Sequence, residues 1–479
     1  MQRHGNNISL FEGVDRVAII LYFLLVMVGL TCVASAGYDD MIDGFFNLRQ
    51  NHIKQAFWAC AAFIVGIFIL LLDSRYYHMY AYFAYAGALV FTAGTIVMPE
   101  AISPVTNGAK AWYEFGPVRI QPAEFAKIAT ALAMARLMSN YSFSINNIKH
   151  LCRVAMIILL PFVIILLQND TGSGLVLGAF IFVLFREGLS KYIYFPVLFT
   201  IFLFVVSLIF EPVVIFTVLI VLFTLYSLLH HGAFEGHVVF LCAIFLVSLL
   251  LAMLTPLSGY AALMIASAIA VVVLLFLVVK THTMSLLWPI IMFIYAMVFV
   301  PTCDLLFSKL EPHQQNRIHT FVGLVDDPQG VGYNVMQSEI AIGSGGLLGK
   351  GLLQGTQNRY DFVPEKHTDF IFSVVGEEWG FVGALIVVSL YMTLILRLMR
   401  MGERIKEPFG RVYCYAVAAM LLLHVCVNIG MTIGLMPVMG IPLPLMSYGG
   451  SSLVAFTLLI MIAIRLDAST VENDGYRGI

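Results

Sequence analysis

The side chains best suited to chemistry gather in one polar, glycine-rich interval, 317–380, of an otherwise apolar chain. Carboxylates can accept a proton as general bases, and lysine and arginine stabilise anionic groups through charge-assisted hydrogen bonds. Glycines let the backbone approach a ligand closely. The interval keeps aromatic and aliphatic residues, which predicts a folded loop rather than a disordered one. Its ionisable residues include Asp326, Asp327, Glu339, Asp361, Glu365, Asp369, Arg317, Lys350, Arg359 and Lys366.

The composition of the chain predicts a helical bundle within a membrane that positions this loop. The 479 residues are 60% hydrophobic and only 11% charged, and the mean hydropathy is +0.92. Soluble domains are about a quarter charged, so we expect an all-α polytopic membrane protein. The net charge of −2 gives no support for a nucleic-acid partner.

A helix that crosses a bilayer needs about 20 mainly apolar residues. By this rule the chain contains fourteen candidate spans, which we expect to form one membrane domain over 1–479. The candidates are 17–37, 55–73, 77–98, 122–138, 152–168, 172–187, 192–210, 213–230, 237–254, 259–279, 285–303, 368–397, 412–436 and 450–466.

The distribution of lysine and arginine predicts the orientation of these spans, because short cytoplasmic segments are enriched in both. With the N-terminus inside, sixteen of these residues fall on the inner side and nine on the outer side. Five of the nine lie in the 304–367 interval, and long loops are a weak guide to orientation. Without those five, sixteen Lys and Arg residues on the inner side compare with four on the outer side, which predicts that this large loop is extracytoplasmic.

Three further polar stretches fall on the same predicted side: 107–127, 168–174 and 434–452. A site built from several loops requires such convergence. For the last stretch, a plain turn between helices is an equally good interpretation. Trp112 in the first stretch either lines the site or belongs to the belt of aromatic residues at the membrane interface.

Ionisable residues within apolar segments are costly in lipid and usually face the interior of the bundle. Glu124 and Lys127 are three residues apart on one predicted helix, so a purely structural ion pair is one interpretation. Asp170 opens a predicted helix and either caps it or lines the site. Asp369 and Glu378 lie along the helix that follows the large loop.

Taken together, these motifs resemble the SEDS family of bacterial membrane proteins (shape, elongation, division and sporulation; RodA, FtsW and SpoVE), and most closely its RodA branch. They occur in the family's order and cover both ends of the chain. The motifs are GAKAW at 108–112, QPAE at 121–124, QND-G at 168–172, DP-G-GY at 327–333, AIGSGGLLGKG at 341–351, PEKHTDFIF at 364–372 with GEE at 376–378, and IGLMPVMGIPLPLMSYGGSS at 433–452.

The sequence departs from the family pattern in four places. Ala111 stands where the family usually has an arginine, with Lys110 as the neighbouring cation, and Asn169 and Ala123 replace the usual proline and serine. The resemblance implies ten spanning helices, whereas this chain has roughly 80 more residues, enough for four helices of about 20. We therefore expect four inserted transmembrane helices at 205–284.

The resemblance implies a peptidoglycan glycosyltransferase that polymerises lipid II into glycan strands during cell elongation. An α-linked donor and a β-linked product require a single inverting displacement, with a carboxylate to accept the hydroxyl proton. The resemblance assigns this general base to Asp327, with Asp326 as the alternative. Residues expected to bind or surround the substrate are Trp112, Lys110, Glu124, Lys127, Asp170, Arg317, Lys350, Lys366, His367, Asp369, Glu378 and Ser447.

The resemblance also implies a position in the bacterial cytoplasmic membrane, a site facing the exterior, and a class B penicillin-binding protein as the transpeptidase partner. No cofactor is certain: a divalent cation, Mg²⁺ or Mn²⁺, between carboxylate and pyrophosphate suits the chemistry, but no local spacing specifies it. Two other functions fit the same bundle. A lipid II flippase would also use broken helices and polar groups at the membrane midplane, and a scaffold would only recruit a partner.

Overall fold

The computed structural model of the protein describes residues 13–37, 50–106, 108–116, 118–231, 259–281, 287–307, 309, 315 and 331–477. The chain divides into two compact units. The first comprises Met1–Ser190 and Asp327–Ile479, and the second is Lys191–Asp326. The predicted insertion at 205–284 lies within the second unit, and its start falls inside a helix of that unit.

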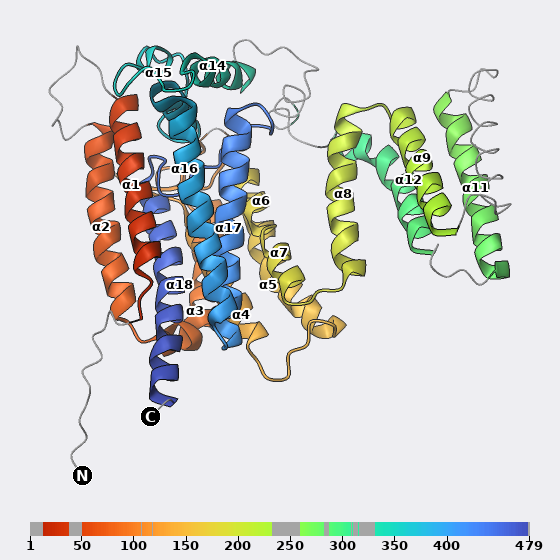
Figure 1. The fold of residues 1–479 in the computed structure, drawn as a ribbon, viewed down its shortest axis with the longest axis horizontal. Coiled ribbons are helices and arrows are strands. Elements are labelled where there is room, and N and C mark those ends of the chain that lie inside the picture. The colour runs from red at the N-terminus through yellow and green to blue at the C-terminus, as the bar shows by residue number, and fades with distance from the viewer. Residues whose placement is uncertain are drawn as a thin grey trace. The chain divides into compact units, whose positions relative to one another are not determined.

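Helices make up nearly all of the first unit (Figure 1). Its helices are α1 (Arg16–Ala36), α2 (Asn51–Leu71), α3 (Ser74–Val97), α4 (Pro122–Met138), α5 (Ile148–Leu167), α6 (Thr171–Leu177), α7 (Phe180–Arg186), α14 (Val331–Ser344), α15 (Thr356–Arg359), α16 (Ile371–Arg404), α17 (Pro408–Thr432) and α18 (Gly450–Arg477). A short antiparallel hairpin of β1 (Tyr113–Phe115) and β2 (Val118–Ile120) precedes α4.

The helix starts follow local capping chemistry. The side chains of Asp15, Asp73 and Asn147 accept hydrogen bonds from backbone N–H groups in the first turns of α1, α3 and α5. These interactions satisfy donors that have no partner within the helix. α4 and α17 instead begin with a proline, which has no N–H to satisfy and a φ suited to a first turn.

α17 and α18 form the interior of the first unit. In their most apolar 18-residue windows, 72% of α17 and 78% of α18 is buried, against 17% for both α3 and α5. Seven helices of the described residues are long and apolar enough to cross a membrane, and shorter apolar helices accompany them. The protein is therefore a polytopic helical membrane protein, with its outer helices exposing large apolar side chains.

Thirteen of the fourteen predicted spans coincide with helices, and the remaining one, 237–254, lies outside the described residues. The predicted span 172–187 is divided into α6 and α7. The large loop predicted at 304–367 contains α14 and α15, which lie at the opposite end of the first unit from the last turns of α18 (Figure 1).

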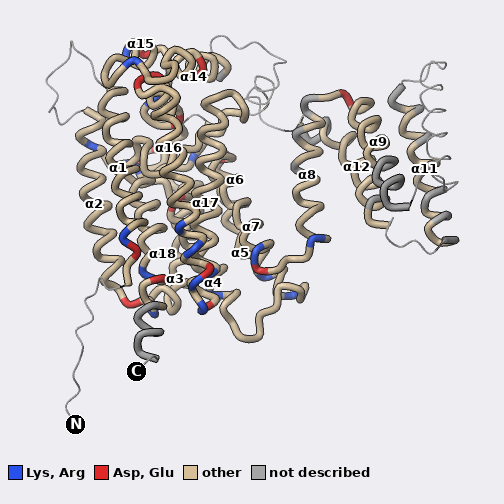
Figure 2. The backbone as a smooth tube through the Cα atoms, in the orientation of Figure 1, with Lys and Arg blue, Asp and Glu red and all other residues tan. Residues whose placement is uncertain are grey.

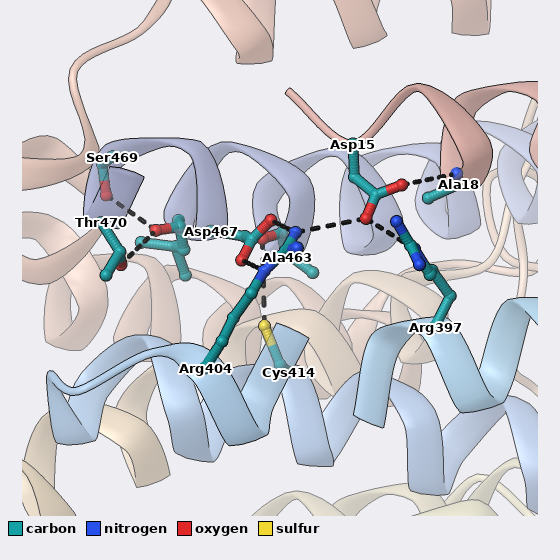
Figure 3. A network of polar contacts seen from close by, with 10 residues as sticks. Asp15, Ala18, Arg397, Arg404, Cys414, Ala463, Asp467, Ser469 and Thr470 are labelled. Atoms are coloured by element: carbon teal, nitrogen blue, oxygen red, sulfur yellow. Dashed lines mark hydrogen bonds and ion pairs between the residues drawn. The ribbon is translucent and has the colours of Figure 1, made fainter. Parts of the chain in front are cut away.

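An ion-pair network ties helices together at the other end of the unit (Figure 3). The Asp15 carboxylate caps α1 through Ala18 N at 3.1 Å and accepts from Arg397 Nε at 2.7 Å. Arg404 pairs with both Asp15 and Asp467, so α1, α16 and α18 are joined. Asp15 and Asp467 are buried, and Lys and Arg residues, together with acidic residues, gather along the backbone at this end (Figure 2). This is the end where the sequence predicts the inner-side arginines.

The second unit has its own apolar core. Its described helices are α8 (Lys191–Ile209), α9 (Pro212–His231), α11 (Gly259–Thr281) and α12 (Leu287–Phe307). Leu203, Phe216, Leu263 and Val300 bring one buried side chain from each of these helices into one cluster. Glu211 lies directly before Pro212, the first residue of α9, so its charge is at a helix end.

Candidate active site

The site begins at a break in α16. Gly380 has φ 66° and ψ −163°, outside helical geometry, so the groups on either side of it lose their helical partners. The 345–351 loop supplies replacements. Phe381 N donates to Gly346 O at 2.9 Å. Val382 N donates to Leu347 O at 3.1 Å. A broken helix at membrane depth is tolerated where such partners exist.

The same loop satisfies the carbonyl groups before the break. Lys350 N donates to Glu377 O at 3.0 Å, and Gly351 N donates to Glu378 O at 3.0 Å. A Cβ atom on Gly349 would lie 2.0 Å from Glu378 O, so only glycine permits this approach. The glycines of the AIGSGGLLGKG motif therefore fit the loop into the break beside the GEE motif.

Glu377 organises the part of the large loop that follows. Its side chain is fully buried. One carboxylate oxygen accepts from Lys350 Nζ at 2.7 Å and Gln357 N at 2.8 Å. The other accepts from Asn358 N at 3.0 Å and Asn358 Nδ2 at 2.6 Å. Lys350, an expected phosphate partner, thus has its charge paired. The sequence places Glu377 in the GEE motif, on the same predicted helix as Asp369 and Glu378, but Glu377 is not among the residues expected to bind or surround the substrate.

Lys366 and His367 lie next to this cluster. Lys366 is buried, pairs with Asp361 Oδ1 at 2.6 Å and donates to the carbonyl of Asn358. His367 is half-buried, and its carbonyl accepts from Tyr448 N at 2.7 Å. Burial, with a smaller contribution from the adjacent Lys366 charge, lowers the pKa of His367 to about 4. The imidazole is therefore neutral near pH 7.

Ser447 joins the end of the large loop to the 434–452 stretch. Its hydroxyl donates to Thr368 O at 2.6 Å and accepts from Leu443 N at 2.8 Å. Gln55 on α2 donates to Ser447 O at 3.2 Å and accepts from Gly449 N at 3.2 Å. The 434–452 stretch is therefore part of the site's frame and more than a turn between two helices.

Asp170 both caps a helix and joins two of the predicted loops. Oδ1 accepts from Ser173 N at 3.0 Å at the start of α6. Oδ2 accepts from Gln121 Nε2 at 2.8 Å, which ties QND-G to QPAE. Lys110 Nζ donates to two carbonyls at the end of α3, at 3.2 and 2.7 Å. Trp112 is half-buried just before β1.

Glu124 and Lys127 form the ion pair that their spacing predicts, and they extend it to a third helix. Lys127 Nζ lies 2.7 Å from Glu124 Oε1 and 3.1 Å from His424 Nε2 on α17. All three side chains are buried. His424 Nδ1 lies 2.8 Å from Met420 O, which leaves Nε2 as the acceptor for the lysine. A charged group is thus held within the bundle by two partners.

Glu378 and Asp369 contact other helices. The buried Glu378 carboxylate accepts from the hydroxyl of Ser35 at the end of α1. The carbonyl of Asp369 accepts from Asn428 Nδ2 at 2.8 Å. Asn428 also donates to Ile441 O at 2.7 Å, so α17 holds two of the loops together. The Glu378 side chain thus connects α16 to α1, and the Asp369 backbone connects the end of the large loop to α17.

The predicted general base falls outside this description. Asp327, its neighbour Asp326, and Arg317 lie outside the described residues. Among the side chains that the structure describes, no three of His, Cys, Asp or Glu come together as a metal site. The divalent cation therefore stays a prediction, as do the role of Asp327 and that of Arg317.

Comparison with known proteins identifies the family. The model for cell cycle proteins of the FtsW/RodA/SpoVE group matches residues 15–227 and 213–472. The chain belongs to this family. The SEDS resemblance stated from the motifs is thereby confirmed.

Relatives within the FtsW/RodA/SpoVE family cover almost the whole chain. Peptidoglycan glycosyltransferase RodA of Treponema pallidum is 34% identical over 464 residues, which cover 94% of this chain and 98% of the relative. Peptidoglycan glycosyltransferase MrdB of Escherichia coli K12 is 29% identical over 437 residues, covering 91% and 88%. A relative named RodA is thus similar to this chain over nearly the full length of both, in agreement with the RodA branch that the motifs resemble.

Solved structures support the fold of this family member. A chain of a peptidoglycan synthase complex, described for its coordination of polymerization and crosslinking, matches with a TM-score of 0.60 at 24% identity. The match covers 95% of this chain and 98% of the neighbouring structure's chain. The rod shape determining protein RodA of Thermus thermophilus matches with a TM-score of 0.53 at 21% identity, covering 95% and 97%. At these identities the likeness shows the fold alone.

Proposed function

We infer that the protein is a peptidoglycan glycosyltransferase that acts in cell elongation. The observation that carries this conclusion is the 34% identity, over nearly the full length of both chains, to a relative with that activity in its name. The described loops that carry family motifs, at 108–112, 121–124, 168–172, 345–351, 364–370 and 434–452, are connected by hydrogen bonds, as a site built from several loops requires. A scaffold without catalysis would not need so many buried polar contacts there.

The substrate that suits this site is lipid II, and the reaction is an inverting transfer. A sugar hydroxyl attacks the anomeric carbon of a second lipid-linked sugar, and the pyrophosphate leaves from the opposite face. Asp327 accepts the hydroxyl proton as general base. Cations stabilise the negative charge on the departing pyrophosphate.

Three of the lysines expected near the substrate are already paired with carboxylates in the described part of the structure. Lys350 is paired with Glu377, Lys366 with Asp361, and Lys127 with Glu124. A lysine already paired with a carboxylate supplies less net charge to a ligand, so these three chiefly hold the loops and the bundle in place. Arg317 is then the leading candidate for direct contact with the pyrophosphate.

We assign the α14 and α15 end of the first unit to the exterior of the cytoplasmic membrane. The sixteen-to-four distribution of lysine and arginine supports this orientation. Lipid II polymerised on that side needs a second enzyme for cross-linking, because the large loop is too small for a transpeptidase domain. We propose a class B penicillin-binding protein as that partner, and the neighbour from a peptidoglycan synthase complex supports it.

A polymerisation assay separates this function from the flippase alternative. Purified protein in detergent, supplied with lipid II and Mg²⁺ or Mn²⁺, is expected to produce glycan strands that resolve as a ladder on a gel. Detergent micelles have no two membrane faces between which a flippase could move its substrate, so a flippase would leave lipid II unchanged. Absence of strands from folded protein, with and without the transpeptidase partner, would overturn the proposed activity.

A further inference from the structure

The 345–351 loop that fills the break in α16 also presents apolar side chains outward. Leu347 and Leu348 are 72% and 80% exposed, and Leu352, one residue beyond the loop, is 52% exposed. Backbone hydrogen bonds to Phe381 and Val382 fix the loop in place. A fixed loop with three exposed leucines within six residues would be unfavourable in water, which indicates that a nonpolar environment covers it.

The helix beside the loop identifies that environment. α16 is one of the helices able to span the membrane. Beyond the break it exposes a series of large apolar side chains, with Phe381 62%, Leu385 54% and Ile386 50% exposed. The loop hydrogen bonds directly to the first residues of this series. The exposed leucines thus adjoin the surface of a spanning helix on which acyl chains pack.

The position of the break along α16 gives the depth of the loop. Residues 381–396, between Gly380 and Arg397, contain no charged side chain. At about 1.5 Å per residue these sixteen residues span about 24 Å, less than the roughly 30 Å of a hydrocarbon core. Arg397 belongs to the ion-pair network at the opposite end. The apolar layer therefore reaches the level of the break.

We propose that the 345–352 segment is a membrane-inserted loop, with Leu347 and Leu348 seated among the lipid acyl chains of the leaflet at this end of α16. Its occupant is lipid rather than a partner protein, because the leucines adjoin the exposed apolar surface of a spanning helix. The insertion holds Lys350 and Glu377, which the same loop connects, at a fixed depth near the bilayer surface. It does not depend on the reaction that the site performs.

Depth-dependent quenching tests this proposal in the full-length chain. The seven native cysteines are replaced, and a single cysteine is introduced by Leu348→Cys, Phe381→Cys or Gln354→Cys and labelled with an environment-sensitive fluorophore. Each protein is placed in nanodiscs of phosphatidylethanolamine and phosphatidylglycerol that contain spin-labelled lipid. Phe381 is the control on the exposed surface of α16, and Gln354 is the exposed polar control beside the loop.

We expect lipid quenching at position 348 to reach at least half of that at 381 and to exceed that at 354 about threefold. Quenching at 348 no stronger than at 354, with aqueous iodide quenching in its place, would overturn the proposal. Weak lipid quenching together with iodide quenching at position 348 is also the result expected if these leucines form a protein-binding surface, because the isolated protein would expose that surface to water. Absence of lipid quenching at both 348 and 381 would equally overturn it, because acyl chains would then not reach this face.

Discussion

At the residue scale, the acidic side chains of the site differ in what surrounds them. Glu377 is surrounded by donors and stabilises the fold of the large loop, so it has no lone pair to spare for a substrate proton. Glu124 is similarly committed to Lys127. Both carboxylates take part in ion pairs with lysines that hold the fold together, and the general base is expected to be a different carboxylate.

The first prediction concerns that base. Asp327→Asn is expected to reduce glycan polymerisation at least 100-fold, because general-base catalysis contributes about 10²–10⁴-fold. The measurement is strand formation from lipid II by purified, monodisperse protein. Asp326→Asn is the matched control and should retain most of the activity. Near-normal activity of Asp327→Asn would remove it from the mechanism.

The second prediction concerns His367 and pH. Because its pKa falls to about 4 from a usual 6.5, the folded state binds fewer protons than the unfolded state between these values. The stability from the neutral imidazole is fully present above pH 6.5 and is lost as pH falls toward 4. Between pH 7 and 5 the loss is about 2 kcal/mol.

His367→Gln should remove this part of the pH dependence, since glutamine cannot titrate. Thermal unfolding of both proteins in the same detergent, at pH 7 and pH 5, measures the difference. Lys366 and Asp361 are the charged groups nearest to the imidazole and remain in both proteins. Equal pH dependence in the two proteins would show that His367 is not the titrating group.

At the scale of elements, the break in α16 and the loop that fills it form one structural unit. Each satisfies backbone groups of the other, so neither is stable in this geometry alone. This explains why AIGSGGLLGKG and GEE, separated by 24 residues from 352 to 375, function as one feature. The buried Glu377–Lys350 pair connects the same two segments through side chains.

The third prediction tests this unit through Gly380. Gly380→Ala should destabilise the protein by about 1–3 kcal/mol, because the φ and ψ at this position are accessible almost only to glycine. A Cβ atom would also lie 2.3 Å from Gly349 N. The measurement is thermal unfolding in detergent together with protease sensitivity of the large loop.

Gly343→Ala is the matched control for Gly380→Ala. Gly343 lies in α14, and a Cβ atom there would meet nothing within 4 Å. Alanine favours a helix over glycine by up to about 1 kcal/mol, so this variant should be neutral or slightly stabilised. Equal behaviour of the two variants would contradict the close fit at the break.

At the scale of the whole molecule, the second unit contains most of the 205–284 segment, which the sequence predicts to be an insertion relative to the family pattern. It has its own buried cluster, and its described helices expose large apolar side chains in the manner of lipid-facing helices. A helix that lines a polar substrate path should carry intramembrane polar groups. The helices predicted as inserted, as distinct from the 308–326 segment that contains Arg317, are therefore expected to be dispensable for the reaction itself.

The fourth prediction is a deletion with corrected bounds. A cut at 205 would fall within α8, so the block to remove is 211–307, which contains α9, the predicted span 237–254, α11 and α12. Four spans are lost, and the downstream part of the chain keeps its orientation. Cysteine accessibility of the 353–362 segment from outside the cell should be unchanged, and some polymerase activity should remain.

Removal of α12 alone is the contrasting variant, because the loss of one span should invert everything downstream or prevent insertion. Accessibility of the 353–362 segment from the cytoplasm in the intact protein would refute the fourteen-span topology. Complete loss of activity in a well-folded four-span deletion would show that the second unit contributes to the site.

Hydropathy and motif order are enough to place the apolar spans and to identify the family. Segments that cross a bilayer must be long, apolar and internally hydrogen-bonded, so hydropathy alone located thirteen spans that coincide with described helices. The order of the motifs then identified the family, because each motif is a short contiguous stretch that can be recognised without knowing the fold. The capping of α6 by Asp170 and the Glu124–Lys127 pair were also foreseeable, because both depend on neighbours within four residues.

Only the tertiary structure decided which polar groups pair across the fold. Glu377 and Glu378 are adjacent in sequence, yet the Glu377 carboxylate accepts from five donors of the large loop and the Glu378 carboxylate accepts from Ser35 on α1. Lys127 finds His424 nearly 300 positions away. Such contacts depend on how helices and loops pack together in space, and no short sequence pattern shows which distant residues become neighbours. The break in α16 belongs to the same class, because its stability comes from a loop that precedes it by some thirty residues.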